Sequence, residues 1–354
     1  MSMRAQTDNG MMQGPDASGP APKTAVRKRS GLWLVALALV ALAVAPTVLP
    51  LSRIYLLTDV LIFGLFAVSY NILLGHSGLL SFGHSAYFGL GAYGTALLLR
   101  FHPEVPVVLA FLLGVLAAMA GGLVIGYFAV RRGGPYFAML TLAFGLMLYT
   151  AAWQWRALTA GDDGFGGFMP GDVTLAGVTL LSFADVRQTY WLVLGVVASC
   201  LLGIWLLLTR TPFGNSVSAI KQNQERATFF GYNVFVIKLI TYTFAATIAG
   251  IAGGLFVLFR DFVSPGVIDL ALATDVVLMT FIGGMYSFLG PMVGAAFYTI
   301  AGDYLASYTD RWELIMGLIF IALVLFEPRG LVGVMERLIR LFSPGRRMPR
   351  DREA

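Results

Sequence analysis

Long apolar runs separated by short polar connections dominate the pattern of the chain. The runs Val35–Leu49 and Val107–Val130 contain no charged residue, and Ile237–Phe259 contains one, Lys238. Apolar runs of about 18 residues or more are typical of membrane-spanning helices. The pattern predicts an all-α polytopic membrane protein with about ten transmembrane segments, some discontinuous, at residues 32–49, 54–74, 79–99, 106–130, 135–155, 190–208, 237–259, 271–285, 289–306 and 312–327.

The stretch from Asn71 to Gly94 departs from this pattern, because glycines and polar residues interrupt the apolar ones. Irregular backbone at membrane depth is tolerated where it is buried in protein or lines a water-filled path, and discontinuous helices often handle polar cargo. Four residues are therefore candidates for a translocation path: Asn71, Ser81, His84 and Asp275. The alternative, which the sequence leaves open, is that their side chains form hydrogen bonds between helices.

Glycines in two regions are candidates for breaking helices or for letting helices pack closely. Within the first region, Gly75, Gly78 and Gly83 are expected to break or bend the chain, whereas Gly89 and Gly91 allow helices to approach each other. The second region is the eighth predicted segment, which Gly283 and Gly284 interrupt.

Composition and charge support a membrane protein. Of the 354 residues, 58% are hydrophobic and only 12% are charged, against about 25% in a typical soluble domain. Basic residues flank the predicted spans, and an inside N-terminus leaves only six of the 24 lysines and arginines outside. We therefore expect cytoplasmic N- and C-termini, contact with the lipid bilayer and no nucleic-acid partner. The six basic residues that this topology places outside are Arg53, Arg100, Arg156, Arg187, Arg260 and Arg311.

The predicted organisation is one membrane domain at residues 31–341 between two basic cytoplasmic tails, 1–30 and 342–354. The first tail is polar and rich in Gly and Pro, so it is expected to be disordered. The basic residues and the apolar run after them imitate a secretory signal, but the long tail favours an uncleaved first span. Two longer loops stand out, an outer one at residues 156–189 and an inner one at residues 209–236.

The sequence argues against several kinds of chemistry. No Gly-Lys dipeptide occurs, so the chain has no phosphate-binding P-loop of its own. The three histidines, His76, His84 and His102, form no H-E-x-x-H motif, and Cys200 is the single cysteine. We therefore expect a protein that is not an enzyme and binds no metal or cofactor itself.

Three aspartates fall within the predicted spans: Asp59, Asp275 and Asp303. Ionisable residues in spans often mark ion or proton pathways. An aspartate in the first turn of a helix instead complements the helix dipole. The sequence favours the helix-start interpretation. A role of these aspartates in coupled transport stays open.

The inner loop predicts a short amphipathic helix on the cytoplasmic side. Ala219, Ile220, Ala227 and Phe230 place small and apolar residues at helical spacing, with polar residues between them. Gly231 is expected to end the helix as a C-terminal cap. Such a helix suits docking into a groove of a soluble partner, although it could also rest on lipid.

Several motifs give this chain a specific resemblance. Glu225, Arg226 and Ala227, followed after three residues by Gly231, resemble the E-A-A-x-x-x-G coupling loop of ABC importer permeases, with Arg226 in place of an alanine. The stretch from Gly75 to Tyr93 and the segments GGPYFAMLTLAFG (133–145), TAGDDGFGG (159–167), FIGGMYSFLGP (281–291) and FEPRGLVG (326–333) are similar to the branched-chain amino-acid importer permeases. The resemblance covers residues 52 to 333 and favours the M-type membrane subunit.

This resemblance implies a subunit of an ATP-driven importer in the bacterial inner membrane. Its partners would be a second homologous permease, two cytoplasmic ATP-binding subunits that hold the ATP, and a periplasmic solute-binding protein. Ala219, Glu225, Arg226, Ala227 and Gly231 would then couple the chain to the ATPase subunits. The cargo would be branched-chain amino acids. The alternatives are an importer for urea, short amides or other small polar solutes, and a self-contained secondary transporter or channel.

Overall fold

The computed structural model describes residues 27–168, 173–175, 178–181, 183, 185–327 and 329–342. The chain divides into two units, Met1–Val44 and Ala45–Ala354. Helix α1 (Arg27–Val48) belongs largely to the first unit and begins before the predicted start of its span at residue 32. The predicted tails at residues 1–30 and 342–354 lie almost entirely outside the described residues.

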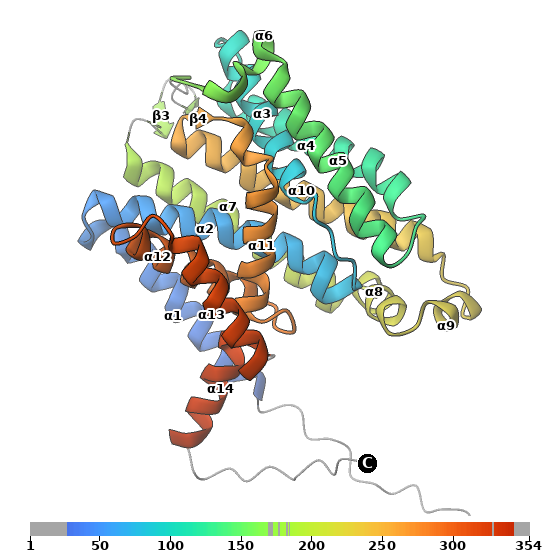
Figure 1. The fold of residues 1–354 in the computed structure, drawn as a ribbon. Helices are drawn as coiled ribbons and strands as arrows, with labels where there is room; N and C mark the ends of the chain where they lie inside the picture. Colours follow the sequence, from blue (N-terminus) through green and yellow to red (C-terminus); the bar gives the residue numbers. More distant parts are fainter. Residues whose placement is uncertain are drawn as a thin grey trace, which may run out of the picture. The chain divides into compact units, whose positions relative to one another are not determined.

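The second unit is built from helices, drawn in Figure 1. Its longer helices are α2 (Leu51–Asn71), α3 (Ser85–Phe101), α4 (Val107–Ala129), α5 (Pro135–Gln154), α7 (Val186–Arg210), α8 (Pro212–Gln222), α10 (Val234–Arg260), α11 (Leu270–Gly283), α12 (Gly290–Ala306), α13 (Trp312–Phe326) and α14 (Gly330–Phe342). Its short elements are the π-helix η1 (Ile72–Ser77), α6 (Arg156–Thr159), the 3-10 turns η2 (Gly161–Asp163) and η3 (Pro265–Val267), α9 (Gln224–Phe229) and the strands β1 (Phe165–Gly166), β2 (Val173–Leu175), β3 (Val178–Leu181) and β4 (Phe262–Val263).

Helix α2 forms the core of this unit. Within α2 and η1, 83% of the most apolar stretch is buried, because α12, α10, α7 and α11 all pack against it. A helix that is apolar on all sides is expected to be buried in this way. Beyond η1, Gly78 adopts a left-handed conformation (φ +71°), and the chain is not helical again until Ser85. The third predicted span, 79–99, is therefore a non-helical segment followed by α3.

Helices α3, α4 and α10 pack tightly against one another through small residues. A Cβ atom added at Gly91 of α3 would lie 2.1 Å from the carbonyl oxygen of Gly250 on α10. One added at Gly253 would lie 1.9 Å from the carbonyl oxygen of Phe88. Small residues that let backbones approach are the usual means of packing helices in membranes.

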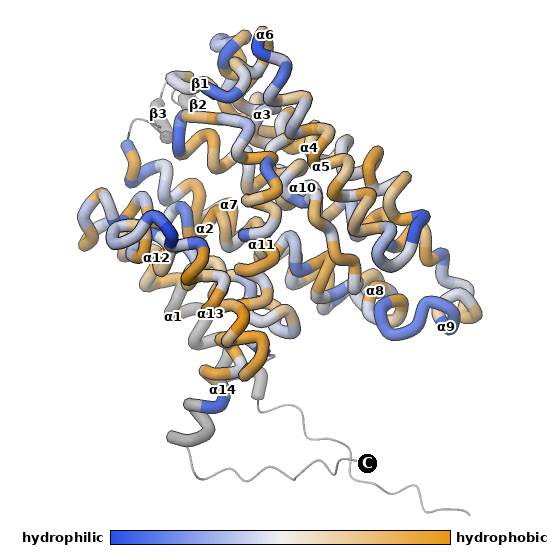
Figure 2. The backbone as a smooth tube through the Cα atoms, in the orientation of Figure 1, coloured by the Kyte–Doolittle hydropathy of each residue, from blue (hydrophilic) through white to orange (hydrophobic). Residues whose placement is uncertain are grey.

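Other helices present apolar side chains outward. In α4, α5 and α7, only 28%, 22% and 22% of the most apolar stretch is buried. Figure 2 shows these helices as predominantly hydrophobic along their length. Apolar surface of this extent is expected where a protein contacts lipid.

The loops that follow α5 and α10 meet at one end of the unit. Strand β1 pairs in antiparallel fashion with β4, so that Phe165 lies opposite Val263. The Arg100 guanidinium at the end of α3 lies 4.4 Å from the centre of the Phe165 ring. The predicted outer loop, 156–189, contains the short strand β1 and the antiparallel hairpin β2–β3.

The predicted number of about ten spans is not confirmed. Each predicted span overlaps a helix, but among the described residues six helical segments are long and apolar enough to cross a membrane. Several of the other helices fall short in length: α3 and α12 have 17 residues each, and α13 has 15. The six are Leu51–Ser77, Val107–Ala129, Pro135–Gln154, Val186–Arg210, Val234–Arg260 and Pro265–Gly283.

Candidate functional site

The inner loop folds as two short helices, α8 and α9, which together with the turn to Gly231 we call the coupling segment (residues 212–231). The sequence predicts one helix, but the chain breaks at Asn223, whose backbone is extended (φ −160°, ψ 109°). The Asn223 side chain accepts a hydrogen bond from the Arg226 N–H at 2.9 Å and so caps α9. Asparagine is among the best N-cap residues, which explains why a new helix begins here.

The end of α9 has the geometry of a Schellman motif. Gly231 is left-handed (φ +83°), its N–H donates to the Thr228 carbonyl, and the Tyr232 N–H donates to the Ala227 carbonyl at 3.1 Å. Glycine adopts this conformation without the strain that a side chain would add.

The coupling segment has a buried base and an exposed tip. Val217 and Ile220 of α8 are buried against the rest of the unit, as is Ala227 of α9. In contrast, Phe229 is 90% exposed and Phe230 is 82% exposed. The prediction that Phe230 belongs to the apolar face of one helix is therefore wrong, because Phe230 follows the end of α9 and points away. The tip of the segment therefore presents two adjacent aromatic side chains, which suit contact with a partner or with lipid.

The remaining predicted coupling residues also lie on this segment. Glu225 and Arg226 are exposed on α9, whereas Ala219 is half-buried on α8. Figure 2 shows α9 as one of the most hydrophilic parts of the unit.

His84 lies at the start of α3 inside a fully enclosed polar and aromatic cluster. Its Nε2 is 2.9 Å from the Ser69 hydroxyl of α2. Its ring stacks on Phe66 with 5.5 Å between centres, and the rings of Tyr70 and Tyr87 meet it edge-on. His84 is 0% exposed. These contacts join α2 to the start of α3. They are of the kind expected if the His84 side chain holds helices together.

The other three path candidates are distributed over different contacts. Ser81 is fully buried, and its hydroxyl has no hydrogen-bond partner within ordinary geometry. Asn71 donates to the Ser287 carbonyl at 3.4 Å, and its Oδ1 has no partner. Asp275 accepts a hydrogen bond from the Tyr298 hydroxyl at 2.5 Å. Ser81 and His84 share a neighbour in Tyr70, whereas Asn71 and Asp275 lie at separate contacts.

The candidate glycines lie at close approaches or at left-handed positions. Gly75 of η1 lies close to the end of α2 and to the connection between α11 and α12, because an added Cβ would meet the Asn71 side chain at 2.1 Å and the Met285 carbonyl at 2.5 Å. Left-handed backbone occurs at Gly78 and Gly284. An added Cβ would lie within 2.1 Å of another atom at Gly83, Gly89, Gly91 and Gly283.

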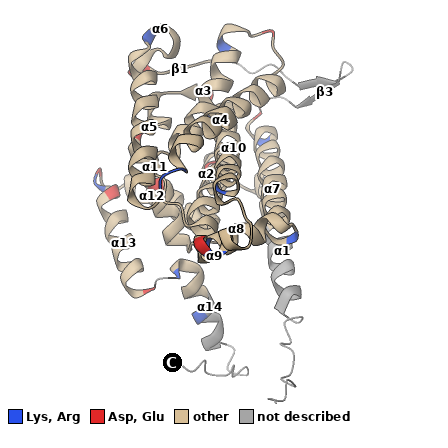
Figure 3. Cartoon of the chain, turned by 90° about the vertical axis from the view of Figure 1, so that its right-hand side faces the viewer, with Lys and Arg blue, Asp and Glu red and all other residues tan. Residues whose placement is uncertain are grey.

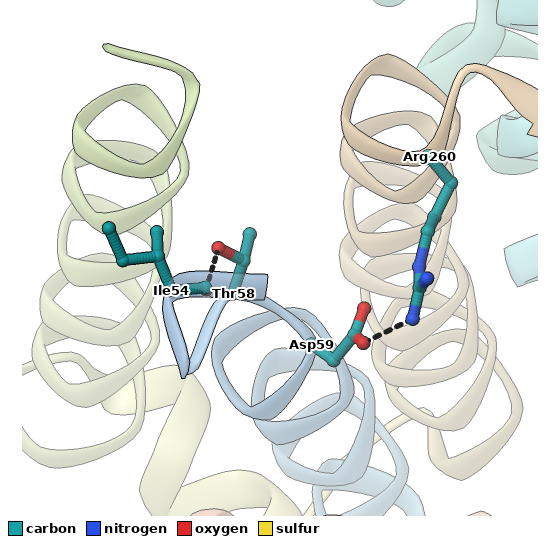
Figure 4. A network of polar contacts seen from close by, with 4 residues as sticks. All are labelled: Ile54, Thr58, Asp59 and Arg260. Carbon is teal, nitrogen blue, oxygen red and sulfur yellow. Dashed lines mark hydrogen bonds and ion pairs between the residues drawn. The ribbon is translucent and has the colours of Figure 1, made fainter. Parts of the chain in front are cut away.

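Asp59 forms an ion pair that the sequence interpretation missed. The Arg260 guanidinium, at the end of α10, binds Asp59 Oδ2, as Figure 4 shows. Thr58 beside it donates to the Ile54 carbonyl at 2.7 Å within α2. The interpretation of Asp59 as a helix-start residue is wrong, since α2 begins at Leu51, two turns earlier.

Charged side chains are sparse along the helices of the described residues. Figure 3 shows that Lys, Arg, Asp and Glu concentrate near helix ends and in connecting segments. Within the described part of the chain, no group of three or more His, Cys, Asp or Glu side chains is arranged to hold a metal ion.

Comparison with known proteins agrees with this architecture. The family model described as "Branched-chain amino acid transport system / permease component" matches residues 52–324. The chain is 25% identical over 331 residues to the high-affinity branched-chain amino acid transport system permease protein LivM of Salmonella typhimurium, covering 88% of this chain and 77% of that protein.

Two further relatives show how far the similarity extends. LivM of Escherichia coli is 25% identical over 332 residues, covering 88% of this chain and 76% of that protein. A probable LivH permease of Methanocaldococcus jannaschii is 31% identical over 158 residues, covering 42% of this chain and 50% of that protein. With its apolar helices, the chain is thus a multi-pass membrane protein, and it belongs to the branched-chain amino acid transport system permease family.

Proposed function

We propose that this chain is a pore-forming subunit of an ATP-driven importer in the bacterial inner membrane. It acts with a second homologous permease, two cytoplasmic ATP-binding subunits that bind the coupling segment, and a periplasmic binding protein that delivers the cargo. Branched-chain amino acids are the proposed cargo, since the relatives are named for their transport.

The observation that carries this proposal is the contrast within the coupling segment. Its base is held by α7, α10 and η1, which contact α8, whereas Phe229 and Phe230 extend from its tip. A firmly held helix with exposed aromatic anchors fits a groove on a soluble partner. Since the chain has no P-loop, such a partner would supply the ATP hydrolysis that drives uptake.

Reconstitution tests the proposal directly. The chain is purified with its cognate permease and ATP-binding subunits, and leucine uptake into proteoliposomes is measured with ATP and the binding protein. Uptake should require every component. The double variant Phe229→Ser/Phe230→Ser should lose the ATP-binding subunits during purification, because the anchors are gone.

The matched control is Phe128→Ser on α4, which removes a phenylalanine of 52% exposure from a different surface. This control should retain the ATP-binding subunits. Leucine uptake by the chain alone would instead identify a self-contained transporter or channel and would refute the proposal. Competition by valine, urea and acetamide separates the amino-acid cargo from the other small solutes.

A further inference from the structure

One exposed cation of the coupling segment reaches the interrupted end of α2. Lys221, in the last turn of α8, donates from its ammonium group to the carbonyl oxygen of Gly75 at 2.5 Å. Its Cγ lies 3.6 Å from the position that a Cβ of Gly78 would occupy. The lysine side chain therefore follows the end of η1, and 146 residues of sequence separate the two bonded groups.

The chemistry of this contact suits the end of a helix. Gly75 lies in the last turn of η1, where backbone carbonyls lack the N–H donors that a continuing helix would supply. A positive charge is favourable there because the C-terminal end of a helix carries partial negative charge. Lys221 thus satisfies an acceptor that exists because the helix is interrupted.

Lys221 also contacts the connection between α11 and α12, residues 284–289. Its ammonium nitrogen lies 5.8 Å from the centre of the Tyr286 ring, within the range of a cation–π interaction. The same connection touches the end of α2 and η1 directly: the Ser287 carbonyl accepts a hydrogen bond from Asn71, and the Met285 carbonyl lies against Gly75. One side chain therefore joins α8 to two segments that already contact each other.

We propose that Lys221 is a positioning residue that transmits movement of the coupling segment to η1 and to residues 284–289. This role rests on the proposed function, since it presupposes an ATPase subunit that moves the segment. When the segment shifts, the bond from Lys221 displaces the interrupted end of α2 together with the connection after α11. Without Lys221, the ATPase subunits still bind through the tip of the segment, but their movement reaches η1 less efficiently.

The test measures leucine uptake and ATP hydrolysis in the same proteoliposomes of the complete importer. We expect Lys221→Met to lower the leucine taken up per ATP hydrolysed about tenfold, the order of one hydrogen bond to a charged group. Binding of the ATPase subunits should be unchanged, and a merely structural role would not change this ratio. Lys221→Arg keeps the charge and should restore part of it.

Arg210→Met serves as the control. It removes a cation from the neighbouring end of α7, where the guanidinium lies over Trp205, and should leave the ratio unchanged. An unchanged ratio in Lys221→Met, with a coupled wild-type importer, overturns the role of Lys221 alone. Wild-type vesicles that take up leucine without ATPase subunits overturn the proposed function and this role with it. If the importer with Lys221→Met does not assemble, the leucine taken up per ATP hydrolysed is measured for Tyr286→Leu instead. A normal ratio in that variant also contradicts the proposal.

Discussion

The ion pair between Asp59 and Arg260 predicts an asymmetric response to mutation. The Asp59 side chain is 8% exposed and the Arg260 side chain is 44% exposed. Asp59 Oδ1 already lacks a partner, so Arg260 provides the charge compensation for a carboxylate with little access to solvent. Arg260→Met should therefore destabilise the protein much more than Asp59→Asn, although both remove the same pair.

The magnitude follows from these exposures. Removing one partner of a fully buried pair costs about 3–5 kcal/mol, and solvent around Arg260 reduces this to about 2 kcal/mol. Asp59→Asn keeps the shape of the side chain and leaves Arg260 partly in water, so it should cost less than about 1 kcal/mol. The double variant should lie close to Asp59→Asn, because no charge remains buried.

Thermal melting of the purified subunit in detergent checks these values. With about 2 °C per kcal/mol for a large chain, Arg260→Met should lower the melting temperature by about 4 °C, and the double variant by about half as much or less. Equal losses from the two single variants would refute the reasoning, as would a double variant that melts no higher than Arg260→Met.

Three further changes test other parts of the structure. Gly253→Ala should lower the melting temperature, since its Cβ would lie 1.9 Å from a backbone oxygen, whereas Gly195→Ala, with nothing within 4 Å, should not. His84→Ala should lower the melting temperature but retain leucine uptake per folded importer, because the ring is fully enclosed; lost uptake would favour a path role. Gly231→Leu forces a side chain into left-handed backbone and should reduce uptake per ATP hydrolysed while membrane insertion, measured by yield, remains normal.

Much of the fold follows from the sequence because single helices are local structures. The apolar runs locate helices at all ten predicted positions, and Gly231 marks the end of α9 through its backbone conformation. The number of spanning helices could not be predicted in the same way. Several apolar helices are shorter than a bilayer crossing, and the run that begins at residue 79 is helical only from Ser85.

The site was harder to predict, since it depends on contacts between distant segments. Arg260 was interpreted as an outer topology signal, and nothing in the sequence links it to Asp59, which lies 201 residues earlier. The break in the coupling segment did have a local signal, because Asn223 precedes the acidic first turn of α9. The sequence also cannot show that Ser69 is the partner of His84, although both are polar residues in apolar surroundings.

These contacts place α2 between two different kinds of attachment. Two turns into α2, the ion pair between Asp59 and Arg260 connects it to the end of α10, after which β4 pairs with β1. At its other end, the helix is interrupted at η1, and the coupling segment reaches it through Lys221. An interrupted helix end yields more readily than one fixed by a buried charge, because fewer regular hydrogen bonds oppose its movement. Displacement of the coupling segment should therefore move the η1 end of α2 first, and Asn71, the last residue of α2, should move with it.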